Sequence, residues 1–229
     1  MKNWFYFLVY AVCYPPMLVT SSPVVLHRER SRRKGPYILA VTHFSPYDVA
    51  CIIKETPRVL DFVSVTELFR HPLPRWFLSN MGAFPLDRGR PDSGTVRVIL
   101  DRLERGRPVA LFPEGHIRTE KTSVLNGGRM KTGVARIARM ANVPIVPCVV
   151  LGARGYHRPR NWIPLRLTRY GINYGEPIFL TDDAQAEPEV FEERLRRAFM
   201  ELNDELRLAM GKGEPRTDPA PPSIATKAD

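Results

Sequence analysis

Short apolar runs alternate with amphipathic stretches along most of this chain, from residue 35 to residue 210. The runs have the length and composition of buried strands, and we expect strands at 37–42, 59–65, 82–86, 108–112, 144–150 and 167–175. The stretches between them place apolar residues at helical spacing, and we expect helices near 46–55, 92–105, 131–141 and 188–210. This alternation predicts an α/β fold: a mostly parallel central sheet flanked by helices.

The composition limits the domain organisation and the class of partner. The chain has 229 residues, 44% of them hydrophobic and 25% charged, and we expect one globular domain over residues 35–210. The segment 211–229 is rich in proline and polar residues and is predicted to be disordered. A net charge of +10 favours an anionic partner: nucleic acid, an anionic membrane surface or a phosphorylated substrate.

The cysteines carry little information about chemistry. Cys13, Cys51 and Cys148 are scattered, and they form neither a CxxC pair nor a Cys/His cluster at zinc spacing. The sequence therefore indicates neither a metal site nor a disulfide framework. This usage fits a reducing, cytosolic setting.

Residues 1–34 differ from the rest of the chain. The stretch Trp4–Val19 is apolar and aromatic, and it is interrupted by two prolines at positions 15 and 16. A basic run follows, between Arg28 and Lys34. We predict a hydrophobic membrane-associating segment that lies in the interface, with the basic run on anionic head groups. A buried helix and a signal peptide are the alternatives.

The motif HFSPYD, at residues 43–48, lies where the first predicted strand ends and a helix begins. Ser45 is a favourable N-cap, Pro46 suits the first helical position, and Asp48 falls in the first turn. A carboxylate on one nitrogen of His43 would fix the tautomer and leave the other nitrogen free to accept a proton. The alternative is that Asp48 caps the helix and His43 is an ordinary loop histidine.

Three further stretches carry charged residues and glycines beside predicted strand ends or helix starts. Arg88 follows the strand at 82–86, where a guanidinium could hold a phosphate in a bidentate manner. In the stretch at 111–118, Gly115 allows a tight turn between Glu114 and Arg118. Lys131 stands among glycines before the helix at 131–141. Each stretch has a structural alternative: a surface loop, a turn or a helix cap.

Four of these segments, in this order, resemble the glycerolipid acyltransferases typified by 1-acylglycerol-3-phosphate acyltransferase. The blocks are HFSPYD at 43–48, GAFPLDR at 82–88, FPEG at 112–115 and VPIVPCVV at 143–150, and the similarity spans roughly residues 35 to 180. The resemblance implies transfer of a fatty acyl group from acyl-CoA or acyl carrier protein to the free hydroxyl of a lysophospholipid. The simplest acceptor is 1-acylglycerol-3-phosphate, which would give phosphatidate in phospholipid biosynthesis.

The resemblance also assigns roles to residues. His43 would be the general base and Asp48 its orienting acid, and the predicted substrate-binding residues are Arg88, Glu114, Gly115, Arg118 and Lys131. Neither a metal nor a cofactor is implied beyond the acyl thioester co-substrate. The implied partners are membrane lipids, the lysophospholipid and the acyl carrier, and the implied location is the cytoplasmic face of the cell membrane.

The chain departs from the family pattern at two places. Thr42 stands where many members have asparagine, and the block that often continues FPEG-Thr-Arg-Ser here continues with His116, Ile117 and Arg118. The arginine is thus displaced by one residue, and we hypothesise that His116 takes the polar contact of the usual threonine. A different lysolipid acceptor and an inactive membrane-bound family member are the alternatives. A basic nucleic-acid-binding protein is a further alternative, although no nucleic-acid-binding motif is recognised.

Overall fold

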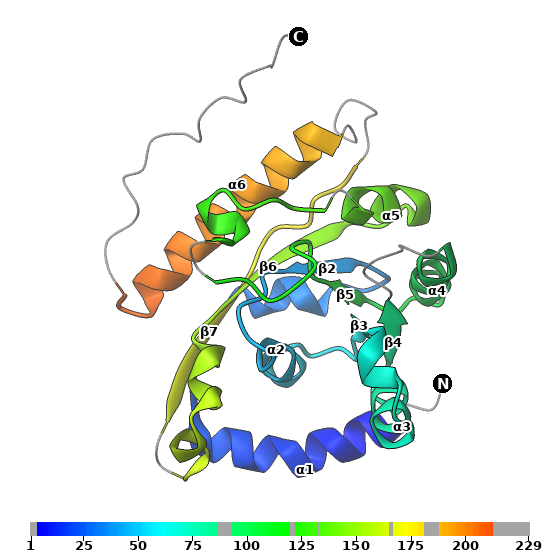
Figure 1. The fold of residues 1–229 in the computed structure, drawn as a ribbon. Coiled ribbons are helices and arrows are strands. Elements are labelled where there is room, and N and C mark those ends of the chain that lie inside the picture. Colours follow the sequence, from blue (N-terminus) through cyan, green and yellow to red (C-terminus); the bar gives the residue numbers. More distant parts are fainter. Residues whose placement is uncertain are drawn as a thin grey trace.

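A seven-stranded sheet forms the centre of the computed structural model, which describes residues 4–86, 93–119, 122–131, 133–164, 167–180 and 188–212 (Figure 1). The strands are β1 (Ser21–Leu26), β2 (Ile38–Val41), β3 (Asp61–Val65), β4 (Ala83–Leu86), β5 (Val109–Leu111), β6 (Ile145–Leu151) and β7 (Thr168–Tyr174). Their order is β1-β7-β6-β2-β5-β3-β4. The neighbours pair in parallel except β6 and β7, so the predicted, mostly parallel α/β sheet is confirmed.

Helices cover both faces of this sheet. They are α1 (Trp4–Thr20), α2 (Asp48–Glu55), α3 (Pro72–Asn80), α4 (Ser93–Glu104), α5 (Gly133–Ala141) and α6 (Pro188–Ala209). Short 3-10 helices are η1 (Arg28–Arg32), η2 (Thr66–Phe69), η4 (Val124–Asn126), η5 (Ala153–His157) and η6 (Pro159–Trp162). In Figure 1, α5 and α6 lie on one side of the sheet and α1 and α2 on the other.

Two hydrophobic clusters lie on the two faces of the sheet because successive strand residues point in opposite directions. In β2, Ile38 and Ala40 enter the cluster under α4, α5 and α6, whereas Leu39 and Val41 enter the cluster under α2 and η5. The predicted apolar stripe of the last helix is confirmed as a core face. Its buried members are Phe191, Leu195, Phe199, Leu202 and Leu206.

The N-terminal segment contributes to the sheet, which the sequence analysis did not predict. β1 pairs in parallel with β7 over its whole length, from Ser21 opposite Thr168 to Leu26 opposite Asn173. Residues 21–26 are therefore part of the α/β domain, although the sequence analysis grouped them with the membrane-associating segment. Pro23 is tolerated because β1 is an edge strand.

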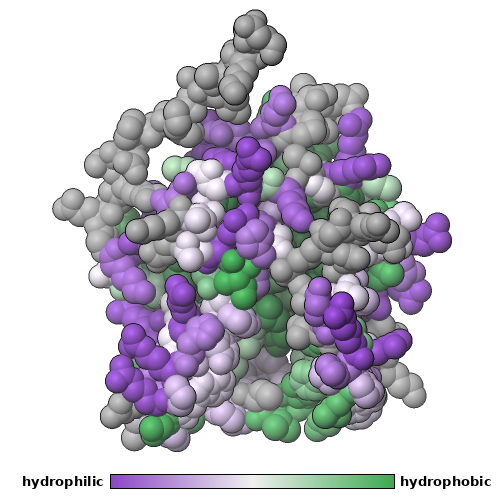
Figure 2. All heavy atoms as spheres, viewed as in Figure 1, coloured by the Kyte–Doolittle hydropathy of each residue, from purple (hydrophilic) through white to green (hydrophobic). Residues whose placement is uncertain are grey.

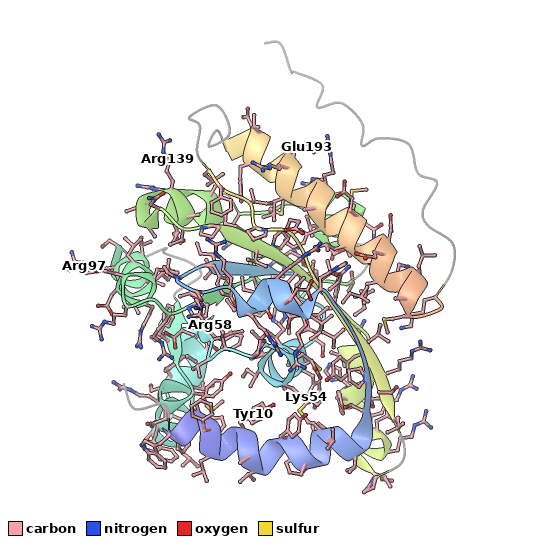
Figure 3. The ribbon with its side chains drawn as sticks, turned by 180° about the vertical axis from the view of Figure 1, so that it is seen from behind. Tyr10, Lys54, Arg58, Arg97, Arg139 and Glu193 are labelled. Atoms are coloured by element: carbon pink, nitrogen blue, oxygen red, sulfur yellow. The ribbon has the colours of Figure 1, made fainter. Side chains whose placement is uncertain are left out.

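The helix α1 continues through both prolines and lies along one edge of the molecule (Figure 1). Phe5, Tyr6 and Met17 are buried against the domain, and the Tyr10 hydroxyl donates to the Lys54 carbonyl of α2 over 3.5 Å (Figure 3). Among the described residues, no helix has both the length and the apolar character that a membrane crossing requires.

The helix α3 was also absent from the sequence prediction. None of its residues, all of which the structure describes, is buried. A helix without a buried face shows no core-directed apolar periodicity, which is the signal that sequence analysis uses.

Candidate active site

The bend that carries His43 follows β2, a central strand between β6 and β5. The Tyr47 N–H donates to the Ser45 hydroxyl over 3.2 Å, and the Asp48 N–H donates to the Ser45 carbonyl over 3.1 Å. These bonds form a turn at residues 45–48, and α2 begins at Asp48 rather than at Pro46. The predicted helix start was therefore two residues early, because this turn precedes the first helical residue.

Asp48 is both a backbone cap and the partner of His43. Its Oδ2 accepts hydrogen bonds from the backbone N–H of Phe44 at 2.7 Å and of Ser45 at 2.8 Å. The same oxygen lies 3.1 Å from Nδ1 of His43. Asp48 is 1% exposed and His43 8% exposed, so the pair is shielded from bulk water. The Asp48 carboxylate thus accepts backbone N–H groups and also contacts His43, and its role as the orienting acid stays a prediction.

The imidazole of His43 is held on its face as well as on its edge. The ring of Phe112 stacks on it with centroids 4.1 Å apart and an interplanar angle of 26°. The backbone is fixed too, because the Arg118 N–H donates to the His43 carbonyl over 2.8 Å. Thr42 accepts the Val150 N–H through its hydroxyl at 3.2 Å. The sequence analysis gave Phe112 no role, although an aromatic residue at a strand end beside the predicted turn was visible.

Glu114 lies in the same electrostatic environment as the His43–Asp48 pair. It is 2% exposed, its Oε1 accepts the Val124 N–H at 3.1 Å, and its Oε2 has no hydrogen-bond partner among the described residues. Burial raises the pKa of Glu114 to about 7; the Val124 N–H and the Arg118 charge oppose this rise, and the Asp48 charge adds to it. Glu114 therefore interacts electrostatically with both a cation, Arg118, and an anion, Asp48, of the predicted site.

The turn after Glu114 lies against Lys131. Gly115 has φ +74°, and a Cβ on it would lie 2.7 Å from Cε of Lys131. The Lys131 N–H donates to the Pro113 carbonyl over 2.8 Å, which ties the two segments together. Arg118 is half-buried, and its Nε is buried without a hydrogen-bond partner in the part of the chain that the structure describes.

The structure thus brings most of the predicted site residues into one region. His43 and Asp48 are in contact, Glu114 interacts electrostatically with Asp48 and Arg118, and Lys131 covers Gly115. Arg88 lies outside the described residues, so its predicted role stays a prediction. The side chain of His116 is exposed, and its hypothesised contact with substrate stays a hypothesis.

One face of the molecule is hollowed (Figure 2). Figure 2 shows a hollow below the centre of the molecule, with hydrophobic side chains along it and hydrophilic margins on both sides. In the same view, α2 is seen end-on beside the position of this hollow (Figure 1). An apolar depression with polar groups at its rim is the usual form of a small-molecule or lipid site.

Two known proteins that resemble this chain carry the same name. A protein named 1-acyl-sn-glycerol-3-phosphate acyltransferase from Streptococcus pneumoniae is 27% identical over 182 residues, 75% of this chain. One of the same name from Bacillus subtilis is 27% identical over 129 residues, 56% of this chain. The chain spans 62% of the length of each of these two relatives.

A solved structure and a family model extend the comparison. The crystal structure of the 1-acyl-sn-glycerophosphate acyltransferase PlsC from Thermotoga maritima matches 81% of this chain and 73% of its own. Its TM-score is 0.61 at 20% identity, which supports the fold alone. The model of the Acyltransferase family matches residues 23–151, more than half of the chain, and this range contains every predicted site residue. The chain therefore belongs to the Acyltransferase family.

Proposed function

We propose that the protein transfers an acyl group from acyl-CoA or acyl carrier protein to the free hydroxyl of 1-acylglycerol-3-phosphate, giving phosphatidate. The observation that carries the proposal is the buried His43–Asp48 pair, joined over 3.1 Å at the carboxyl end of β2. Two relatives that carry the name of this activity support the choice of acceptor.

In this reaction His43 acts as the general base. Its Nδ1 faces Asp48, which leaves Nε2 to take the proton of the acceptor hydroxyl. The hydroxyl oxygen attacks the thioester carbonyl carbon and forms the new C–O bond. The C–S bond breaks, and the proton on Nε2 passes to the departing thiolate. Asp48 stabilises the imidazolium that exists between the two proton transfers.

The acceptor phosphate is bound by the cationic residues near this pair. The interaction of Arg118 with Glu114 and the position of Lys131 over Gly115 support this assignment. The family resemblance adds Arg88 to the residues that bind the phosphate. Glu114 accepts a hydrogen bond from the glycerol part, for which its Oε2 has no competing partner among the described residues.

The protein acts at the cytoplasmic face of a membrane, where both acyl-chain substrates are found. The apolar helix α1 and the net charge of +10 support this location, because they favour association with an anionic lipid surface. The reaction as written needs no metal and no cofactor besides the thioester.

Transfer of a radiolabelled acyl group by the detergent-solubilised protein tests the proposal. Acyl-CoA and acyl carrier protein are the donors, and lysophosphatidate, other lysophospholipids and glycerol 3-phosphate are the acceptors. We expect transfer to lysophosphatidate, and a loss of about 10²–10⁴-fold in His43→Ala. His27→Asn is the control: His27 pairs with Glu205 of α6 at 2.8 Å and has φ 52°, which asparagine tolerates.

Each outcome of this assay has a distinct meaning. Equal transfer by wild type and His43→Ala would show that His43 is not the base. Absence of transfer to every acceptor would overturn the proposed activity. Preference for another lysolipid would change the proposed acceptor. We name this alternative because Arg118 is displaced by one residue from the position of the arginine in the family pattern.

A further inference from the structure

Exposed apolar side chains gather on three elements along one edge of the molecule: α1, α3 and η6 (Figure 1). We call these side chains the apolar strip. Its members, each at least 41% exposed, are Trp4, Phe7, Leu8, Val12, Leu18 and Val19 on α1, Leu73, Trp76 and Phe77 on α3, and Trp162 and the adjoining Ile163 of η6. Apolar patches of this extent on a folded protein mark interaction surfaces.

Direct contacts join the three elements into one surface. At the start of α1, the ring of Phe5 packs edge-on against Trp76 at 4.9 Å and Phe77 at 5.9 Å. At its other end, the Tyr156 hydroxyl donates to the Thr20 carbonyl over 3.4 Å, and the Tyr156 ring lies 4.9 Å from Trp162. The strip therefore runs from α3 along α1 to η6.

The charged residues within the segments that carry the strip are basic, although one exposed acid, Glu67 of η2, precedes Arg70 by three residues. The sequence of α1 contains no charged residue. The segment 70–80 contains Arg70 and Arg75 and no acid, and the segment 153–164 contains three arginines and no acid. These five arginines are exposed. An uncharged middle with basic ends complements a surface that combines hydrocarbon with negative head groups.

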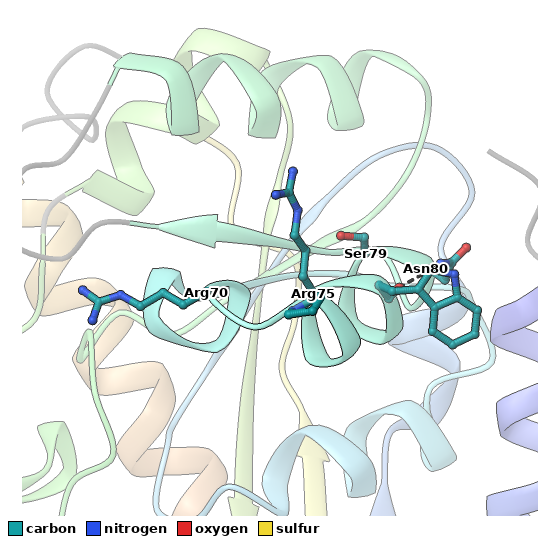
Figure 4. Close-up of a pocket in the computed structure, with 6 residues that line it drawn as sticks. Arg70, Arg75, Ser79 and Asn80 are labelled. Carbon is teal, nitrogen blue, oxygen red and sulfur yellow. Dashed lines mark hydrogen bonds between the residues drawn. The ribbon is translucent and has the colours of Figure 1, made fainter.

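Basic and aromatic side chains border a depression on α3. It has a volume of about 390 Å³ and is lined by Arg70, Pro72, Arg75, Trp76, Ser79 and Asn80 (Figure 4). The two guanidinium groups point in different directions in Figure 4, and the Asn80 amide donates to the Trp76 carbonyl over 2.8 Å. The two exposed arginines favour contact with anionic head groups at the surface of a bilayer.

The tryptophans give the strongest evidence for a lipid surface. The chain contains three, Trp4, Trp76 and Trp162, and all three belong to the strip, at 61%, 55% and 42% exposure. An indole has an apolar body and an N–H donor, and it is enriched where hydrocarbon meets head groups. The three indoles lie one on each of the three elements, as expected if all three elements meet one interface.

We propose that the apolar strip docks flat on an anionic phospholipid bilayer, with α3 and η6 joining α1 in the membrane contact. The inference rests on the proposed function for the lipid nature of the substrate. Its consequence for catalysis follows from Tyr47, which immediately precedes Asp48 and lies 5.9 Å from Trp162 between ring centroids. Docking of η6 thus sets the catalytic pair beside the bilayer, from which the acceptor enters.

Tryptophan fluorescence tests the docking of each element separately. In three variants of the full chain, two tryptophans are replaced by phenylalanine and one remains. Each variant is mixed with vesicles of phosphatidylglycerol and phosphatidylcholine whose acyl chains carry bromine, a quencher that acts at short range. We expect all three indoles to be quenched. Quenching of Trp4 without Trp76 and Trp162 would show that α1 binds alone and would overturn the proposal.

Arginine variants test the charge contribution. We expect Arg70→Gln with Arg75→Gln to weaken binding to anionic vesicles about 30-fold, and to leave the slight binding to neutral vesicles unchanged. Arg97→Gln with Arg139→Gln removes the same charge from α4 and α5, which lie away from α1, and should change binding little (Figure 3). Equal losses in both pairs would mean that net charge alone attracts the membrane and would overturn the assignment of this surface.

Two further measurements separate this proposal from the proposed function. If the indoles stay unquenched while the protein forms dimers by light scattering, a second copy covers the strip and the proposal fails. Acyl transfer to detergent-dispersed acceptor does not need docking. Transfer without docking would therefore refute the membrane surface and leave the proposed activity intact. Docking without transfer would refute the proposed activity and leave the membrane surface intact.

Discussion

The imidazole of His43, the proposed general base, is constrained from two directions, since Asp48 meets the edge of its ring and Phe112 meets its face. An aromatic face also stabilises the imidazolium, by about 0.5–2 kcal/mol. We expect Phe112→Leu to lower kcat about tenfold and to leave KM unchanged, because the loss falls on the protonated state of His43. Phe112→Tyr, which keeps the ring, should retain most of the activity. A change in KM alone would show that Phe112 binds substrate instead.

Glu114 should make the stability of the fold depend on pH. Its pKa is raised by burial from 4.5 to about 7, so the folded state holds the proton more tightly than the unfolded chain. Stability contributed by the neutral carboxyl is therefore lost as the pH rises from about 4.5 to about 7. We expect the free energy of unfolding of Glu114→Gln, relative to wild type, to rise by up to about 3 kcal/mol over this window.

Urea unfolding at several pH values measures this difference. Glu193→Gln serves as the control, because Glu193 is a half-exposed carboxyl on α6 whose replacement should give no such pH dependence. A constant difference between Glu114→Gln and wild type would mean that the Glu114 carboxyl is not shielded as the structure indicates.

At the scale of elements, the turn between β5 and the segment after it depends on a glycine. Gly115 and Gly106 have nearly equal backbone angles, φ +74° and +73°, but a Cβ would meet Lys131 only at Gly115. Alanine at either position should cost about 1–2 kcal/mol of stability for its left-handed backbone. We expect Gly115→Ala to lose acyl transfer in addition, because Lys131 must move, whereas Gly106→Ala should keep it. Melting temperatures and transfer rates of both variants check this, and equal activities would exclude a role for the contact.

The sequence predicted the strands whose residues are buried in the core. Strands such as β2 and β6 have no exposed residue, so each is a continuous apolar run. The pair His43 and Asp48 was recognisable because only four residues separate them across a strand-to-helix bend. The stacking of Phe112 on His43 was not, since the angle between two rings is set by the packing of three segments rather than by local spacing.

At the scale of the whole molecule, the N-terminal region illustrates what local signals miss. The sequence Ser21–Leu26 lies between an apolar helix and a basic run, and its partner strand is about 150 residues away. Further contacts anchor the basic run itself: Arg30 donates to the Tyr174 carbonyl at 2.9 Å, and Tyr37 donates to the Ser31 carbonyl at 2.9 Å. The pairing of two strands so far apart in the chain produces no hydrophobic periodicity in either segment that would predict it.

Two truncations distinguish α1, which we propose contacts the membrane, from the part of this region that the fold requires. Removal of residues 1–20 deletes α1, which buries Phe5, Tyr6 and Met17 but contributes no strand. Removal of residues 1–34 also deletes β1 and exposes the edge of β7, including the buried residues Tyr170 and Ile172. We expect the shorter truncation to unfold cooperatively at a lowered melting temperature, and the longer one to show no cooperative transition by circular dichroism. A cooperative transition at the same temperature in both would mean that β1 adds nothing to the stability of the sheet, and that the domain begins near residue 35 as its sequence alone predicts.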